Sequence, residues 1–229
     1  MLDTFHRYIP VYDEIRRDSN YPKVSVLDVG SNGVGIGRYL TEPETRITVL
    51  DLNRPPVQDT ASFTKVDYVI SNGIKMPFQD DTFDYVVCVG VIEHVEKEER
   101  RAFLSEITRV SKKSVLLVFP QSRAKKSEDF ARWFIRNKSV FLREHETNDL
   151  PKKSDVISAF AGYRVHEKKL MNAVIWIPLK LISSLYLRVF GEYKTLNNHV
   201  FKLYRSVVYP FLNFGTPYSI YLKIEKQKT

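Results

Sequence analysis

The chain has 229 residues, of which 43% are hydrophobic and 27% charged, so it can bury one substantial core and has the composition of a globular protein. Its one cysteine, Cys88, excludes an internal disulfide, and no cysteine–histidine cluster has zinc spacing, so we expect no metal. The first residues lack a signal-peptide pattern, and the longest apolar run, Ala173–Leu179, is too short to span a bilayer. We therefore expect a cytoplasmic protein with a single domain over residues 1–229.

The net charge of +8 is unevenly distributed along the chain. Residues 1–120 hold 15 Lys and Arg against 18 Asp and Glu, a balance of −3, whereas residues 121–229 hold 20 against 9, a balance of +11. A strongly basic half predicts an anionic substrate or an anionic surface as its partner. The alternative is that the basic residues only keep an aromatic-rich half of the chain soluble.

The first predicted elements are a helix and a strand, followed by a glycine-rich turn. Apolar residues at helical spacing predict a leading helix within residues 1–23, which begins at Val11 or is broken near Pro10. The apolar run 24–29 predicts a buried strand. Glycines at positions 30, 33, 35 and 37 predict a tight turn whose backbone approaches a ligand, with a helix starting over that ligand.

Two carboxylates flank this turn. Asp51 ends the next predicted strand, Arg46–Leu50, and is placed there to accept hydrogen bonds from both hydroxyls of a ribose. Asp28 stands two positions before Gly30 and suits an ammonium group; alternatively it is a turn carboxylate that accepts hydrogen bonds from nearby backbone amides. The glycine spacing does not fit the nicotinamide dinucleotide fingerprint. Together these residues predict an adenosine-containing cofactor, and S-adenosyl-L-methionine has a tail with the ammonium group that suits Asp28.

The later elements change in character at Pro120. Before it, predicted strands at 85–89 and 115–119 enclose a helix at 98–110, an alternation typical of a parallel sheet with helices on both faces. After it, the pattern predicts helices over 127–138, 154–160, 178–190 and 196–214, and strands over 162–168 and 217–225. The apolar stripe of 176–190 favours a core-facing helix or a substrate lid, and it also fits peripheral contact with a membrane.

The motifs after the second strand resemble those of a known family. Residues 72–78 (NGIKMPF), 79–84 (QDDTFD) and 92–95 (IEHV) stand in order around the predicted strand 85–89. With the glycine turn, this set resembles the class I S-adenosylmethionine-dependent methyltransferases of the type 11 branch, closely over 24–119 and more loosely through 142–151. The resemblance implies an α/β fold with a Rossmann-like, seven-stranded, mostly parallel sheet. Its last strand would run antiparallel beside strand five, after a helical insertion at about 178–214.

The resemblance also implies roles for individual residues. Residues 24–119 would form the cofactor-binding core, and residues 120–229 the substrate-side elements. Ser31 and Asn32 depart from the family, which has a second glycine or a cysteine in the turn, and Asn72 stands where the family has an acid facing the adenine amino group. The cofactor would contact Asp28, Gly30, Ser31, Asn32, Gly33, Asp51, Leu52, Asn72, Gly73, Ile74 and Val89.

The predicted reaction is O- or N-methylation of a small-molecule, glycan or lipid-linked acceptor. His94 and His145 are the candidate general bases, because imidazole titrates near neutral pH; either could instead shape the pocket or brace a loop. A catalytically silent cofactor-binding protein and a nucleic-acid methyltransferase stay open as alternatives. Nucleic acid is the less favoured partner, because the basic residues are dispersed and no base-methylation motif is present.

Overall fold

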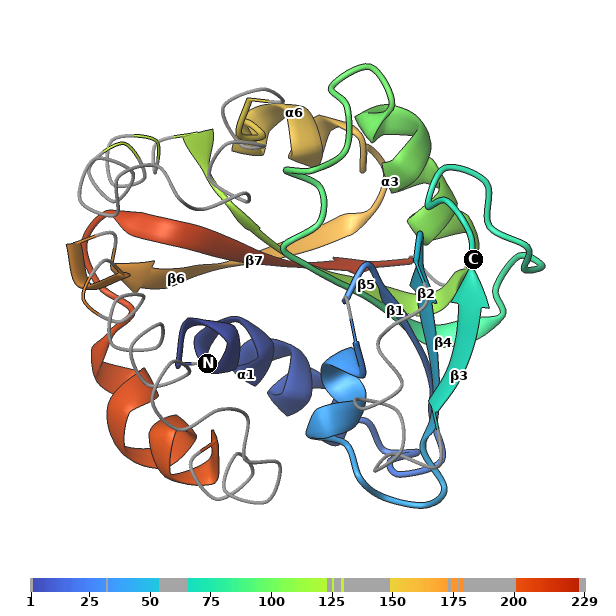
Figure 1. The fold of residues 1–229 in the computed structure, drawn as a ribbon, viewed down its shortest axis with the longest axis horizontal. Coiled ribbons are helices and arrows are strands. Elements are labelled where there is room, and N and C mark those ends of the chain that lie inside the picture. The colour runs from blue at the N-terminus through green and yellow to red at the C-terminus, as the bar shows by residue number, and fades with distance from the viewer. Residues whose placement is uncertain are drawn as a thin grey trace.

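A computed structural model describes residues 2–31, 33–53, 66–122, 149–172 and 201–226, together with positions 125, 129, 174–176 and 178 (Figure 1). The helices of these residues are α1 (Leu2–Arg16), α3 (Arg100–Arg109) and α6 (Lys153–Ser158), with the short turns η1 (Gly35–Arg38), η3 (Tyr204–Val208) and η4 (Tyr209–Phe211). The strands are β1 (Ser25–Val29), β2 (Arg46–Asp51), β3 (Val66–Ile70), β4 (Phe83–Val89), β5 (Ser111–Pro120), β6 (Arg164–Asn172) and β7 (Pro217–Glu225). Within these ranges no helix is long and apolar enough to cross a membrane.

The strands form one mixed sheet in the order β3-β2-β1-β4-β5-β7-β6. Strands β1 to β5 pair in parallel, whereas β7 pairs antiparallel with both β5 and β6. The predicted Rossmann-like sheet, with its last strand antiparallel beside the fifth, is therefore confirmed. The chain runs outward from β1 to β3 and returns to β4, so the strand order reverses between β1 and β4. Open α/β sheets bind ligands outside the carboxyl ends of the strands at such a point.

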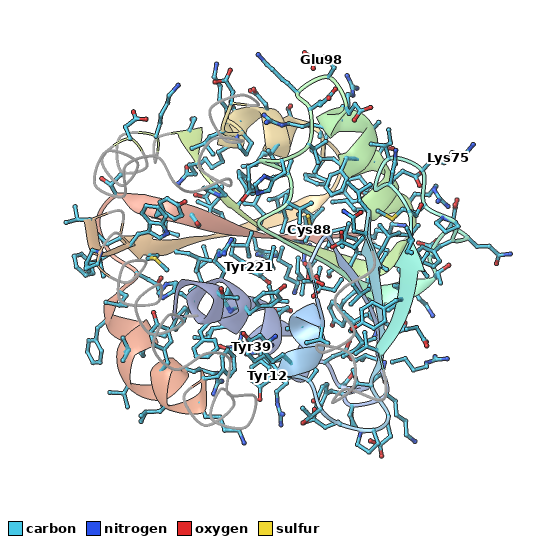
Figure 2. All side chains as sticks on the ribbon, viewed as in Figure 1. Tyr12, Tyr39, Lys75, Cys88, Glu98 and Tyr221 are labelled. Atoms are coloured by element: carbon cyan, nitrogen blue, oxygen red, sulfur yellow. The ribbon has the colours of Figure 1, made fainter. Side chains whose placement is uncertain are left out.

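Helices cover both faces of the sheet (Figure 1). The α1 helix and η1 lie against one face, with the segment 201–211 beside α1, while α3 and α6 cover the other. Successive strand residues point to opposite faces, so Val26 and Val87 pack in the α1 layer while Leu27 and Cys88 pack in the α3 layer. Cys88 is fully buried at the centre of the molecule, and burial raises its thiol pKa (Figure 2). It packs as a small apolar side chain.

Two expectations for the first half of the chain were wrong. The helix α1 is continuous from Leu2 to Arg16 and neither begins at Val11 nor breaks at Pro10. A proline removes one backbone hydrogen bond from a helix, but the burial of Phe5 and Ile9 against the sheet outweighs that loss. The helix predicted over the glycine turn is reduced to the single turn η1, because its glycines are poor helix formers.

The other differences lie toward the C-terminus. Strand β6 extends to Asn172, beyond the predicted 162–168, because it pairs along the whole length of β7. Strand β3 was not assigned from the sequence. Most of the predicted helices 127–138 and 178–190, and residues 196–200, lie outside the described residues. From 201 to 211 a short α-helical stretch, η3 and η4 follow one another in place of one regular helix.

A buried histidine ties α1 to this C-terminal segment. His6 is fully buried, and its Nδ1 lies 2.9 Å from the hydroxyl of Tyr204 while its Nε2 lies 2.7 Å from Oδ1 of Asn213. Because Asn213 Oδ1 also accepts the backbone N–H of Met171, it is an acceptor, so Nε2 of His6 donates to it. His6 thus connects α1, β6 and the segment before β7.

Candidate functional site

The carboxyl ends of β1, β2 and β4 meet at the glycine turn. Gly30 has a φ of 68°, and its backbone N–H donates to the carbonyl of Leu50 at the end of β2, at 2.8 Å. A Cβ on Gly30 would come within 2.8 Å of the Val91 side chain, which follows β4. A residue with a side chain would therefore be strained here and would push the three strand ends apart.

Asp28 anchors the second half of the turn. Its side chain is fully buried, and Oδ2 accepts the backbone N–H of Ile36 at 2.6 Å and the hydroxyl of Tyr8 at 3.5 Å. Gly35 has a φ of 49°, and a Cβ there would overlap Asp28 Oδ2 and lie 2.7 Å from the Cβ of Ser31. Gly35 is thus required for the carboxylate to reach η1. The contact with Ile36 is the backbone-amide role that the sequence left open for Asp28.

The second oxygen of Asp28 has no such contact. Oδ1 is buried, and no group of the described residues donates a hydrogen bond to it. Burial raises the pKa of Asp28 to about 7, against the hydrogen bonds from Ile36 and Tyr8 that lower it, and the charge of Asp51 raises it further. A buried acceptor without a donor is costly. An ammonium group placed at Oδ1 would pair with it and favour the ionised carboxylate, so this oxygen fits a cationic tail of the cofactor.

Asp51 stands where the sequence predicts it, at the end of β2. It is partly exposed, and its Oδ1 accepts the backbone N–H of Asn53 at 3.4 Å. The next residue, Leu52, is 67% exposed, and Ile70, which pairs with Asp51 in the register of β2 and β3, is 62% exposed. Two large apolar side chains therefore stand in solvent beside a carboxylate, an arrangement suited to a flat aromatic group attached to a diol.

The loop after β3 holds the other predicted adenine contacts. Asn72 is exposed, and its side-chain Oδ1 accepts the backbone N–H of Ile74 at 2.7 Å, which shapes the turn. Gly73 lies against Phe103 of α3, since a Cβ there would come within 2.6 Å of the ring. Gly73 thus has a packing requirement of its own. The partly exposed Ile74 packs against the α3 side of the core.

The loop after β4 carries Glu93, part of the motif at 92–95, and meets two arginines, Arg7 of α1 and Arg100 of α3, that the sequence analysis did not identify. Gly90 has a φ of 73°, and a Cβ there would overlap Nη1 of Arg7, which reaches this loop from α1, and lie 3.5 Å from Oε1 of Glu93. Glu93 is 2% exposed, and its charge raises the pKa of Arg100 against a larger lowering by burial. Arg7 and Tyr8 belong to the leading helix, and nothing in their local sequence signals a role at this edge.

The remaining predicted site residues fall into two groups. Val89 ends β4 and is 7% exposed, and His94 is partly buried in the following loop, where its backbone N–H donates to Val91 at 2.8 Å. Ser31 and Gly33 lie in the glycine turn, joined by a 3.2 Å hydrogen bond from Ser31 Oγ to the Gly33 carbonyl. Asn32 and His145 lie outside the described residues. No three acids, histidines or cysteines in the described part could hold a metal ion together.

Comparison with known proteins places this edge of the sheet in a known class. Residues 27–119 match the family described as "Methyltransferase domain". The ubiquinone biosynthesis O-methyltransferase of Rickettsia bellii is 26% identical over 132 residues, 53% of this chain and 55% of that protein. That of Rickettsia conorii is 25% identical over 124 residues, 52% of this chain and 43% of that protein. The chain spans about half the length of the curated relatives it matches.

Solved structures share the fold across nearly the whole chain. Magnesium protoporphyrin IX methyltransferase from Synechocystis, with bound SAH, has a TM-score of 0.61 and 13% identity and covers 98% of this chain and 84% of that one. A SAM-dependent methyltransferase from Archaeoglobus fulgidus has a TM-score of 0.56 and 17% identity, over 95% and 93% of the two chains.

The sheet order, the antiparallel β7 and the glycine turn between two strand-end acids define a class I methyltransferase fold. Over residues 27–119 the chain matches the methyltransferase-domain family, in agreement with the resemblance to S-adenosylmethionine-dependent methyltransferases that its motifs predicted.

Proposed function

We propose that this protein transfers a methyl group from S-adenosylmethionine to a small-molecule acceptor. The observation that carries the proposal is the buried Asp28 carboxylate, whose Oδ1 has no donor in the described part of the chain, at the turn where the strand order reverses. A cofactor with a cationic tail supplies the group that this oxygen lacks. Asp51, at the tip of the adjacent strand β2, is available to the ribose of the same molecule.

The chain's own contribution is to bind, orient and exclude water. Bound S-adenosylmethionine supplies a methyl group on a sulfonium sulfur that is itself the leaving group. Asp28 would hold the ammonium group and Asp51 the ribose hydroxyls, while Gly30 lets the backbone approach the tail. The apolar side chains of Leu52 and Ile74 would cover the adenine, with Asn72 at its amino edge. Orientation of the reacting groups alone can lower a barrier by about 7–11 kcal/mol.

A hydroxyl acceptor also needs a group that takes its proton. His94 is the candidate within the described residues, because the loop after β4 lies beside the glycine turn and contacts Gly30 through Val91. In our proposal a ring nitrogen of His94 accepts the acceptor's proton as the methyl group is transferred. His145 is the second candidate.

Two observations support an acceptor class. The relatives named as ubiquinone biosynthesis O-methyltransferases favour O-methylation of a small molecule, with N-methylation or a glycan or lipid-linked acceptor as variants of the same reaction. The charge balance of +11 over residues 121–229 favours an anionic acceptor, free in the cytoplasm or presented on an anionic membrane surface.

Calorimetry with the full chain tests the cofactor assignment. S-adenosylhomocysteine, the product form, should bind, and NAD should not. The Asp51→Ala variant should bind S-adenosylhomocysteine more weakly by roughly 1.5–3 kcal/mol, since hydrogen bonds to an ionised group are lost. The matched control is Asp67→Ala, which removes an exposed carboxylate from the edge strand β3 and should leave the affinity unchanged. NAD binding without any response to S-adenosylhomocysteine would refute the assignment.

Incubation with labelled S-adenosylmethionine and fractionated cell extract tests the reaction. A labelled small molecule is the expected result. Cofactor binding with no labelled product in any fraction would instead indicate a silent cofactor-binding protein. Labelled RNA or DNA, with binding that weakens steeply as salt rises, would indicate a nucleic-acid methyltransferase.

A further inference from the structure

A cavity of about 660 Å³ lies between α3 and α6, away from the glycine turn. Its walls come from the first turn of α3, the segment 149–152 and α6, together with Ile92 after β4 and Ser122 after β5. The cavity thus opens at the carboxyl ends of β4 and β5, on the same edge of the sheet as the proposed cofactor site. Its volume is that of a small-molecule binding pocket.

The described lining of this cavity is rich in positive charge. Five cationic side chains contribute to it, against the two acids Asp149 and Asp155; they are Lys97, Arg100, Arg101, Lys125 and Lys152. Beneath them lie apolar residues, including the buried Leu104 and Val156. A charged rim over an apolar floor suits a molecule that has an anionic group and an apolar or ring-shaped body.

The guanidinium group of Arg100 is already hydrogen-bonded to two backbone carbonyls of the protein. Its Nε donates to the carbonyl of Val95 at 3.1 Å, and its Nη2 donates to the carbonyl of Asp149 at 2.6 Å. It therefore joins the loop after β4 to the segment before α6 and shapes the cavity. By contrast, Arg101 and Lys152 form no ion pair with any carboxylate of the described residues.

A second cavity lined by basic residues provides a comparison, because several of its cations form ion pairs within the fold. It has about 640 Å³ and lies at the opposite edge of the sheet, with Lys112, Lys113, Lys223 and Lys226 in its lining. There Lys113 pairs with Asp18 at 2.8 Å and Lys223 pairs with Glu14 at 2.7 Å. Lys226 pairs with Asp81, in the loop before β4. Three of the five cations in this lining therefore pair with acids within the fold, whereas Arg101 and Lys152 at the α3–α6 cavity form no ion pair among the described residues.

The adjacent residues Lys152 and Lys153 differ in the same way, since only one of them has an ion pair among the described residues. Lys153 Nζ lies 2.9 Å from Oε2 of Glu167 on β6 and does not line the cavity, whereas Lys152 lines it and is exposed. Glu98, close in sequence to the cationic rim, projects outward from the body of the molecule (Figure 2). The charges of Glu98 and of the lining acids Asp149 and Asp155 act on Arg100, so the exposed cations Arg101 and Lys152 are the candidate ligands of an anion instead.

We propose that the α3–α6 cavity binds a phosphate group of the methyl acceptor, with Arg101 and Lys152 as its exposed ligands. The proposal rests on the proposed function, since it takes the cavity's ligand to be the acceptor of the methyl group. A guanidinium offers paired donors that match phosphate oxygens, and an ammonium adds a point charge. The phosphate can belong to a water-soluble molecule or to a lipid headgroup, and the cavity recognises the same group in both.

Titration of the full chain with inorganic pyrophosphate tests the site without requiring methyl transfer. Wild type should bind pyrophosphate with an affinity that falls as salt rises. Arg101→Ala and Lys152→Ala should each weaken binding roughly three- to tenfold, for the loss of one charge-assisted contact at a partly exposed site. Two variants are matched controls: Lys153→Ala removes a lysine that is ion-paired with Glu167, and Lys112→Ala removes a lysine of the second cavity. Their affinity for pyrophosphate should stay within about twofold of wild type.

The outcomes separate this proposal from the proposed function. If all four variants bind pyrophosphate equally, or wild type does not bind it, the cavity is not a phosphate site, whatever the cofactor result. Unchanged S-adenosylhomocysteine binding in Arg101→Ala and Lys152→Ala shows that the loss is confined to the cavity. Competition with a soluble sugar phosphate, or with vesicles of phosphatidylcholine with and without phosphatidylglycerol, identifies the soluble or the lipid source.

Discussion

Replacing Asp28 by asparagine should stabilise the free protein at high pH. Burial raises the pKa of Asp28 from 3.8 to about 7, and each pKa unit corresponds to about 1.4 kcal/mol. Keeping this carboxylate ionised in the folded, cofactor-free protein therefore costs about 4 kcal/mol above pH 7. Asparagine keeps an oxygen for the Ile36 N–H and carries no charge, so it removes this cost.

The pH dependence follows from the sign of the shift. Because the folded pKa is raised, the folded state keeps a proton that the unfolded state releases between about pH 4 and pH 7, and wild-type stability falls across that window. The stability of Asp28→Asn relative to wild type should therefore grow by about 3 kcal/mol between pH 5 and pH 8. Urea unfolding at several pH values measures this difference. Asp67→Asn, an exposed carboxylate on β3, is the control and should run parallel to wild type.

Whereas the stability of the wild type should fall as pH rises, its affinity for the cofactor should increase. An ammonium at Oδ1 favours the ionised carboxylate, so wild-type affinity for S-adenosylhomocysteine should rise as pH rises through about 7, with proton release on binding below that pH. Asp28→Asn should bind more weakly and lose this dependence. A stability difference that does not change with pH would refute the burial argument, and an unchanged affinity in the variant would place the ammonium elsewhere.

Two further substitutions test the turn and the C-terminal attachment. Gly35→Ala should lower the free energy of unfolding by at least about 1–2 kcal/mol and weaken S-adenosylhomocysteine binding, because its Cβ overlaps Asp28 at a φ of 49°; wild-type values in both assays would contradict the turn geometry. His6→Ala should cost about 3 kcal/mol in urea unfolding, since the buried imidazole and its contacts with Tyr204 and Asn213 are lost. A loss below about 0.5 kcal/mol would mean that the segment 201–213 does not contribute to the stability of the fold.

The arrangement of residues at the proposed cofactor site could be predicted because its signals are local. A strand, a glycine turn and an acid at the next strand end lie within 28 consecutive positions, 24–51, and a crossover between parallel strands has one hand. The placement of Asp28 and Asp51 at one edge of the sheet follows from this. Arg7 and Tyr8 could not be predicted there, because they come from a preceding helix whose docking depends on apolar burial far from the turn.

The sequence by itself determined the alternation of strands and helices apart from β3, the class of the fold and the glycine turn, because these depend on short-range periodicity and backbone conformation. Only the tertiary structure decided which charges are available. It pairs Lys153 with Glu167 and leaves Lys152 at the cavity, and it buries Asp28 so that its pKa moves to about 7. Pairing and desolvation depend on groups distant in the chain and on the surrounding medium, which no local pattern of residues specifies.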